Sequence, residues 1–217
     1  MRVSGVLLGA GVSSRFGSPK MLAPVGEDRK PLLQKVCETW LGAGIDDLLI
    51  VLGCGAADIR ATLEETLLRK VKRDESAAAT VRFVENPRWE AGMFSSVKAG
   101  LAAASPDSTH VAVSPADLPF LRESSLRRLL EAVRLPEAGG PATLLVPVCD
   151  RRRGHPLLIP AALRSRLLSW PDSARLNQLF EEPDVTVHTL EGFDETILRD
   201  VDSPSDLLAS RSSSFSL

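Results

Sequence analysis

Short apolar runs alternate along the chain with longer segments in which apolar residues recur at helical spacing. The runs are rich in Val, Ile and Leu, the composition of strands buried on both faces, and they cover residues 3–8, 47–52, 81–84, 111–114 and 143–148. The segments with helical spacing lie between them, at residues 32–41, 57–70, 96–104 and 124–133. Strands that alternate with helices predict a parallel sheet built from right-handed strand–helix–strand units.

The pattern is less regular after residue 150. Three shorter strand candidates lie there, at residues 156–159, 185–189 and 197–201. We expect them to extend the same sheet, because no linker separates them from the first part of the chain. Residues 71–80 and 136–141 are predicted to be exposed connections, since their polar, Ala, Gly and Pro content offers little to bury.

Length and composition fit one ordinary globular domain. The chain has 217 residues, of which 44% are hydrophobic and 25% are charged, close to the average for folded domains. We therefore predict a single α/β domain over residues 1–209, with a Rossmann-like, mostly parallel sheet flanked by helices. Residues 210–217 are predicted to be a polar tail that frays.

Charge and cysteine usage exclude several classes of partner. The formal net charge of −2 provides no basic field for wrapping nucleic acid, so a small molecule is the expected partner. Cys37, Cys54 and Cys149 form no close pair, which fits neither a disulfide framework nor a metal-binding pair. The N-terminal apolar run is too short for a signal peptide or a membrane span. We expect a cytoplasmic location with no membrane contact.

A glycine-rich loop directly follows the first predicted strand. It reads Leu8-Gly9-Ala10-Gly11-Val12-Ser13-Ser14-Arg15. Small residues allow backbone N–H groups to approach an anion, and Arg15 and Lys20 supply positive charge to a triphosphate. The alternative is a solvated glycine turn with two surface cations.

Two better-known phosphate motifs do not fit this loop. A P-loop has Ser or Thr directly after a Gly-Lys pair, whereas Lys20 lies between Pro19 and Met21. A dinucleotide fingerprint has a third glycine where Ser14 stands and an acidic residue at the end of the second strand. Gly53 follows that strand instead, so neither motif explains the loop.

An aspartate lies just past the fourth predicted strand, where open α/β sheets bind their ligands. This residue is Asp117, two positions before Pro119. A hard cation that bridges phosphate oxygens needs one or two protein carboxylates, so Asp117 is a candidate Mg²⁺ ligand. A single aspartate at a strand end has an alternative role as a helix cap or turn former.

The glycine loop matches the signature Leu-Ala-Ala-Gly-x-Ser-x-Arg-Met-Gly-x-x-Lys. The matching residues are Leu8, Ala10, Gly11, Ser13, Arg15, Gly17 and Lys20, while Gly9 replaces the first Ala and Phe16 replaces Met. With these residues the chain resembles the nucleotidyltransferases related to molybdenum cofactor cytidylyl- and guanylyltransferases. The resemblance implies a nucleotide-diphospho-sugar transferase type of α/β fold.

Further segments match the same family in the same order. Residues 86–101 resemble the segment that closes over the nucleoside in the cytidylyltransferase branch, which implies nucleotide contacts from Gly92, Ser95 and Ser96. The two serine hydroxyls have an alternative role as caps of the following helix. Residues 153–156 resemble an Arg-Gly-His-Pro segment that faces the acceptor. Acceptor contacts are thereby implied for Arg153, Gly154 and His155, although a short basic run is otherwise a solvated loop.

Residues 198–207 resemble the family's closing signature, Asp-Ile-Asp-Thr-Pro-Glu-Asp-Leu. In a strand, Asp200 and Asp202 would point to the same face, so both could aim at one cation. The resemblance favours Asp202 as the second metal ligand beside Asp117. The alternative is that Asp202 or Ser203 caps a last helix that begins at Pro204.

The resemblance implies an enzyme that uses Mg²⁺ to transfer a nucleoside monophosphate from a nucleoside triphosphate, CTP, to a phosphate-bearing acceptor, molybdopterin. Pyrophosphate leaves, and a molybdoenzyme or chaperone is a further candidate partner. The implied catalytic residues are Arg15, Lys20 and Asp117, and the implied nucleotide-binding residues are Leu8, Gly9, Ala10, Gly11, Ser13, Ser14, Arg15, Lys20, Gly92, Ser95 and Ser96. The alternatives are a guanylyltransferase or sugar-phosphate nucleotidyltransferase of this fold, an NAD(P)-binding oxidoreductase, and a non-catalytic nucleotide-binding protein.

Overall fold

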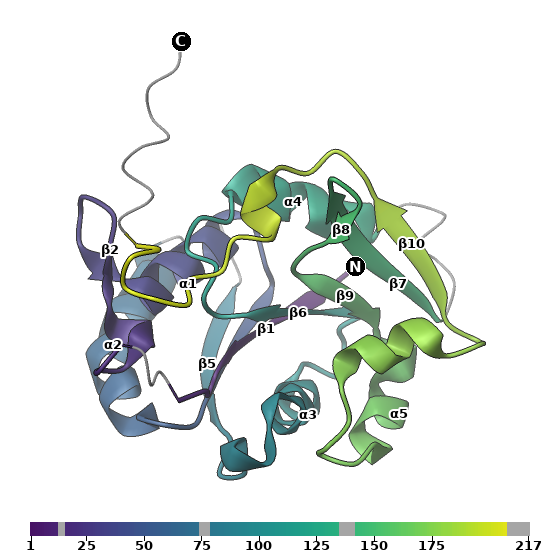
Figure 1. Cartoon of the computed structure of the whole chain (residues 1–217), viewed down its shortest axis with the longest axis horizontal. Coiled ribbons are helices and arrows are strands. Elements are labelled where there is room, and N and C mark those ends of the chain that lie inside the picture. The colour runs from purple at the N-terminus through teal and green to yellow at the C-terminus, as the bar shows by residue number, and fades with distance from the viewer. Residues whose placement is uncertain (13–15, 74–78, 135–141, 208–217) are drawn as a thin grey trace.

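The computed structural model describes residues 1–12, 16–73, 79–134 and 142–207. One large sheet forms its centre (Figure 1), with strands β1 (Val3–Gly9), β4 (Asp47–Leu52), β5 (Thr80–Glu85), β6 (His110–Pro115), β7 (Thr143–Cys149), β9 (Leu157–Pro160) and β10 (Thr186–Leu190). Their order in space is β10-β7-β9-β6-β1-β4-β5, and the short β8 (Arg152–Arg153) pairs with β7. A separate hairpin contains β2 (Pro24–Val25) and β3 (Lys30–Pro31).

The sheet is mixed but mostly parallel, as predicted. β1 lies between β4 and β6 and is parallel to both, β5 is parallel to β4, and β10 is parallel to β7. Among the described strands, β9 runs antiparallel to both β6 and β7, and the short β8 runs antiparallel to β7. The carboxyl ends of β1, β4, β6 and β7 therefore meet at one edge of the sheet, where open α/β sheets bind ligands.

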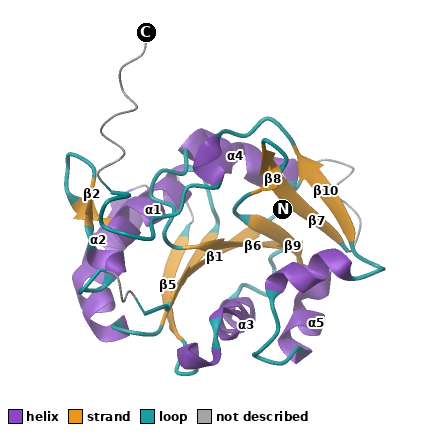
Figure 2. Cartoon of the chain, viewed as in Figure 1, coloured by secondary structure: helices purple, strands orange, loops and turns teal. Residues whose placement is uncertain are grey.

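Helices cover both faces of the sheet (Figure 2). α1 (Leu32–Gly42), α2 (Ala56–Arg73) and α4 (Glu123–Ala132) pack on one face, and α3 (Met93–Ala103) and α5 (Arg164–Ser169) pack on the other. Successive strand residues point to opposite faces. Leu48 and Ile50 thus join the core beneath α1, whereas Leu49 and Val51 join the core beneath α3. Burial on both faces explains the unbroken apolar runs in the sequence.

α3 approaches β1 closely at Gly100. A Cβ atom at this position would lie 2.3 Å from a methyl carbon of Val6, so even alanine would push the helix away from the sheet. The close contact fixes the height of α3 above the sheet. It also places the first turn of α3 beside the end of β1, where the candidate site lies.

Short 3-10 helices occupy several connections. They are η1 (Lys20–Leu22), η2 (Trp89–Ala91), η4 (Ala161–Leu163), η5 (Leu176–Glu181) and η6 (Glu195–Ile197). Among the described residues, no helix combines the length and the apolar character that crossing a bilayer would need.

Most predicted elements are present within a few residues of their expected ends, and β9 and β10 extend the same sheet as predicted. The strand predicted at residues 197–201 is wrong, because η6 and a loop occupy this stretch. Its backbone makes isolated hydrogen bonds, from His155 N to Ile197 O and from Val201 N to Asp117 O, and these do not form a ladder.

The connection predicted at residues 71–80 is also partly wrong. α2 continues through Arg73 and β5 begins at Thr80, because Val71 packs against the core beneath α1 and extends the apolar side of α2. The predictions for residues 136–141 and for the tail at residues 210–217 lie outside the described residues.

Candidate active site

A cleft of about 530 Å³ opens at the carboxyl ends of β1 and β6. The described residues that line it are Leu8, Gly9, Ala10, Gly11, Val12, Phe16, Lys20, Met21, Trp89, Glu90, Gly92, Met93, Ser96, Pro115, Asp117 and Asp202. Four segments that are distant in the sequence therefore meet here: the glycine loop with η1, the turn before α3, the end of β6 and the loop after η6.

The glycine loop forms the floor of the cleft. β1 ends at Gly9, and the carbonyl oxygen of Ala10 accepts a hydrogen bond from the Cys54 N–H at 3.2 Å. A Cβ atom at Gly53 would lie 2.8 Å from this oxygen and 2.5 Å from Cβ of Trp89. Gly53, directly after β4, thus lies in close contact with both the glycine loop and the Trp89 turn. No acidic residue that could bind a ribose stands at this strand end. The predicted roles of Ser13, Ser14 and Arg15 lie outside the described residues.

Lys20 and Asp117 form an ion pair inside the cleft. Lys20 Nζ lies 2.7 Å from Asp117 Oδ2, and the two side chains are only 13% and 19% exposed. Lys20 also donates a hydrogen bond of 2.5 Å to the carbonyl oxygen of Val201. Lys20 therefore connects the start of the chain to the segment that carries Asp202.

The second carboxylate oxygen of Asp117 is buried without a donor. Among the described residues, Asp117 Oδ1 has no hydrogen-bond partner, and the backbone carbonyl of Asp117 is used by Val201 N at 2.9 Å. A buried carboxylate oxygen without a donor is costly, and a divalent cation would satisfy it. This orphaned oxygen fits the Mg²⁺ ligand that the sequence predicts.

The loop after Val201 places Asp202 on the cleft. Asp206 accepts hydrogen bonds from the Asp202 N–H at 2.9 Å and from the Ser203 N–H at 2.7 Å. Hydrogen bonds from the Ser203 side chain and from these two N–H groups lower the pKa of Asp206, and the charge of Lys20 lowers it further. Residues 204–207 form a turn and not the start of the helix that the alternative prediction required, so among the described residues neither Asp202 nor Ser203 caps a helix here.

Only one of the two candidate second metal ligands reaches the cleft. Both side chains are exposed, but Asp202 lines the cleft, whereas Asp200 is not among the described lining residues. The expected shared face does not exist, because no strand forms here. No group of three or more His, Cys, Asp or Glu side chains that could hold a metal occurs among the described residues. Two carboxylates suit a Mg²⁺ ion that keeps waters and phosphate oxygens as its other ligands.

The turn before α3 forms the opposite wall. Gly92 adopts a φ of 110° and its amide donates to the Trp89 carbonyl oxygen. The buried Asn86 amide donates to both serine hydroxyls, at 2.8 Å to Ser95 and 3.0 Å to Ser96. The single hydrogen of the Ser95 hydroxyl lies within bonding distance of two carbonyl oxygens, with Ser95 Oγ 2.7 Å from that of Gly92 and 2.9 Å from that of Arg88.

The two serines in this wall have different positions relative to the cleft. α3 begins at Met93, so both serines lie inside its first turn and the predicted capping role is wrong. Ser96 lines the cleft, as Gly92 does. Ser95 is not among the described lining residues, and its hydroxyl holds the turn from behind.

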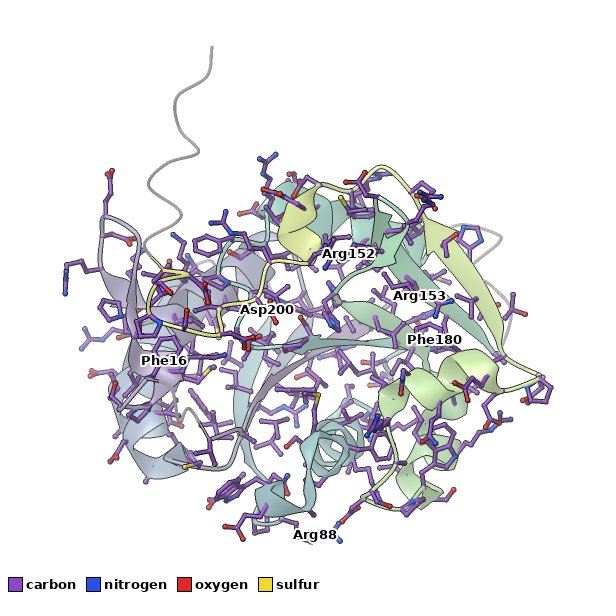
Figure 3. The ribbon with its side chains drawn as sticks, viewed as in Figure 1. Phe16, Arg88, Arg152, Arg153, Phe180 and Asp200 are labelled. Carbon is purple, nitrogen blue, oxygen red and sulfur yellow. The ribbon has the colours of Figure 1, made fainter. Side chains whose placement is uncertain are left out.

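Apolar side chains line the mouth of the cleft, and sequence reasoning did not single them out. Val12 and Met93 are 59% and 70% exposed, Trp89 is half-buried, and Phe16 lies on the η1 side (Figure 3). The signal for Trp89 and Met93 was present, because both lie inside the matched segment 86–101. Glu90 adds the one acidic side chain that the described part of this wall contributes to the lining.

The residues predicted to bind the acceptor lie at the end of β8 and directly after it. Arg153 follows a tight turn and its guanidinium lies 4.2 Å from the ring centroid of Phe180 (Figure 3). Gly154 is buried where a Cβ atom would lie 2.6 Å from Ile197 side-chain atoms. Burial lowers the pKa of His155, and the negative charges of Asp117 and Asp200 oppose this shift. None of these three belongs to the described cleft lining.

The chain is similar to known proteins over most of its length. A family model described as a MobA-like NTP transferase domain matches residues 5–187. The chain is 33% identical over 206 residues to the nicotine blue oxidoreductase of Paenarthrobacter nicotinovorans, covering 93% of this chain and 92% of that protein.

Two solved structures share the fold. A nucleotidyl transferase from Methanothermobacter has a TM-score of 0.73 and 22% identity, covering 97% of this chain and 96% of its own. A Mycobacterium tuberculosis protein in complex with manganese has a TM-score of 0.67 and 22% identity, covering 96% of this chain and 97% of its own. The mixed sheet flanked by helices is that of the nucleotide-diphospho-sugar transferase type.

Proposed function

The chain belongs to the MobA-like NTP transferase domain family, and from this premise we propose that it transfers a nucleoside monophosphate from a nucleoside triphosphate to the phosphate of a small acceptor. One observation carries the proposal. In a cleft floored by the glycine loop, the half-buried Asp117 offers a buried carboxylate oxygen without a donor, and a lysine lies directly beside it. This arrangement suits a divalent cation bound together with phosphates.

The residues of the cleft divide the work of binding. Backbone N–H groups of the glycine loop and the Lys20 ammonium would bind the triphosphate. Asp117 and Asp202 would hold Mg²⁺, and the structural relative that contains manganese supports a divalent cation. When bound, the cation would offset the negative charge that develops on the triphosphate.

The reaction needs little from the protein beyond positioning. The acceptor phosphate is already an anionic nucleophile, so its oxygen can attack the α-phosphorus in line while the bond to pyrophosphate breaks. No side-chain nucleophile or strong general base is required. The described lining contains no Cys or His, which agrees with a mechanism based on orientation and charge neutralisation.

CTP is the proposed donor and molybdopterin the proposed acceptor. Support comes from the resemblance of residues 86–101 and 153–156 to the cytidylyltransferase branch, and from the position of Gly92 and Ser96 on the cleft. A molybdoenzyme or its chaperone would then receive the product. GTP and sugar phosphates are the alternatives within the same fold, and competition between donors distinguishes them.

An oxidoreductase is the second candidate function. It is favoured by the relative of 33% identity that is named nicotine blue oxidoreductase and matches nearly the whole chain. Gly53 and Cys54, which follow β4, provide no acidic ribose ligand for NAD. The cleft instead holds Asp117 and Asp202, whose carboxylates suit a metal.

A thermal-shift screen separates the two candidates. A ligand that binds the native state raises its melting temperature by mass action. We expect CTP or GTP to raise it only with Mg²⁺ or Mn²⁺ present, and Asp117→Asn to remove most of this shift. Stabilisation by NAD or NADP without a metal, and none by nucleoside triphosphates, would favour the oxidoreductase.

A further inference from the structure

The wall of the cleft that precedes α3 has little regular structure to hold its shape. It consists of η2, a residue in the left-handed region at Gly92, and the first turn of α3. Its inner side is fastened by Asn86 and Ser95. Its outer side is fastened by a segment from the last third of the chain, at residues 170–172, which no sequence motif points to.

Asp172 contacts a cation on each side of this wall. Its Oδ2 lies 2.9 Å from Nη1 of Arg88, which precedes η2, and its Oδ1 lies 3.1 Å from Nζ of Lys98, which follows in α3. The contact between Asp172 Oδ1 and Lys98 is an ion pair only. Among the described residues, no donor makes a hydrogen bond to this oxygen. One carboxylate thus bridges the two ends of the segment that contributes Trp89, Glu90, Gly92 and Met93 to the cleft.

Neighbouring contacts make the attachment more than a surface ion pair. Lys98 Nζ also donates to the carbonyl oxygen of Trp170 at 2.7 Å, and the Trp170 ring stacks on Phe94 with centroids 5.9 Å apart. The Asp172 and Lys98 side chains are 19% and 18% exposed. Isolated exposed ion pairs contribute little to stability. A mostly buried carboxylate that is shared by two cations contributes more, because removing a cation would leave its charge poorly compensated.

We propose that Asp172 is a positioning residue for the nucleotide. It fixes the 86–96 wall through Arg88 and Lys98, and so sets donor affinity without touching the metal, the phosphates or the base. The inference rests on the proposed function in so far as the cleft binds a nucleoside triphosphate. Lys20 and Asp117 pair with each other, whereas Asp172 pairs with Arg88 and Lys98, so the phosphate half of the site should be unaffected by the loss of Asp172.

The test combines a structural readout with a binding readout. Amide hydrogen exchange in the nucleotide-free protein reports opening of the wall, because the amides of Arg88, Trp89, Ala91, Gly92 and Ser95 are hydrogen-bonded within it. Asp172→Asn should speed exchange across residues 86–96 by about threefold or more and weaken CTP·Mg²⁺ binding, measured by calorimetry, by about threefold to tenfold. Turnover at saturating CTP should stay within about twofold, and Asp172→Glu should restore part of the affinity.

Asp184→Asn is the matched control. Asp184 forms a two-bonded pair with Arg166 in the same part of the chain, at 2.8 and 2.5 Å, but has no contact with the wall. It should leave both exchange and CTP affinity unchanged. If Asp172→Asn does not fold, Arg88→Met replaces it, because Arg88 is 66% exposed and its removal deletes one arm only.

The outcomes separate this inference from the proposed function. If amide hydrogen exchange across residues 86–96 is unchanged in both Asp172→Asn and Arg88→Met, Asp172 does not fix the wall. Faster exchange with unchanged CTP and GTP affinity would overturn the positioning role. Failure of the unaltered protein to bind any nucleoside triphosphate would instead overturn the proposed function, while exchange would still show whether Asp172 holds the wall.

Discussion

Lys20 Nζ lies 2.7 Å from Asp117 Oδ2, so the residue proposed to bind phosphate occupies one oxygen of the residue proposed to bind the metal. Lys20 therefore neutralises Asp117 when no ligand is bound. A triphosphate would draw the ammonium away and leave the carboxylate to a divalent cation. We infer that nucleotide and metal favour each other's binding, as thermodynamic linkage then requires in both directions.

Lys20→Met tests this exchange. Without its resident cation, Asp117 should bind Mn²⁺ about tenfold more tightly in the absence of nucleotide, whereas CTP affinity and transfer should fall, because a charged donor to the triphosphate is lost. Titration calorimetry with Mn²⁺ alone and with CTP alone measures both effects. Equal Mn²⁺ affinity in the two proteins would show that Lys20 does not compete for Asp117.

Asp202 and Asp200 should differ in their effect on metal binding. Asp202 lines the cleft and Asp200 does not, so Asp202→Asn should weaken Mn²⁺ binding in the presence of CTP by about tenfold and Asp200→Asn by less than about twofold. Electron paramagnetic resonance of free Mn²⁺ measures both. The opposite ranking would assign the second ligand to Asp200.

Protein stability should fall as the pH is lowered from 7.5 to 5.5. Burial lowers the pKa of His110, so the unfolded state binds a proton more readily than the folded state. The stability that neutral His110 contributes is fully present above its ordinary pKa of 6.5 and is lost as the pH falls toward the folded value. The slope for one such group is at most about 1.4 kcal/mol per pH unit.

Urea unfolding of the protein and of His110→Asn checks this prediction. The variant should show a shallower dependence of the unfolding free energy on pH over the same range. His155, whose pKa burial also lowers, should retain its own share of the slope in both proteins. If the unfolding free energies of the two proteins depend on pH in the same way, His110 is not a source of the pH dependence.

CTP should outcompete GTP as the donor. A pocket that hydrogen-bonds one base leaves its own polar groups unpaired against another, and the wall that contains Gly92 and Ser96 resembles the cytidylyltransferase branch. Competition kinetics with molybdopterin as acceptor compare the two specificity constants. A GTP value equal to or above that of CTP would replace the base assignment and leave the metal and phosphate assignments in place.

The sequence predicted most of the sheet because burial on both faces leaves long apolar runs. It also predicted that Gly9, Lys20 and Asp117 share a site, since strand ends and their loops meet at one edge. Asp202 was added to this site by the resemblance to the family's closing signature. The strand expected at residues 197–201 failed because Ile197 and Val201 are buried without a ladder partner. Burial alone cannot distinguish such a loop from a strand.

Contacts between distant, weakly patterned segments were beyond sequence reasoning. Nothing in the local sequence indicates that Asp172 meets Arg88 and Lys98, because long-range ion pairs leave no periodic signal. The orphaned oxygen of Asp117 likewise emerges only once packing shows which donors reach it. The sequence predicted that Asp117 and Lys20 lie in the same site, but it did not predict the ion pair between them.

Transfer of label from [α-³²P]CTP to acceptor tests the central claim most directly. With Mg²⁺ and molybdopterin, or one of a panel of sugar phosphates, the protein should move the label into an acceptor-linked product and release one pyrophosphate for each label moved. Asp117→Asn should fold normally and lose at least about 100-fold in this rate, because the charge that holds the cation is removed. Transfer at an undiminished rate by Asp117→Asn, or no transfer to any acceptor by a protein that binds CTP and Mg²⁺, would contradict the account.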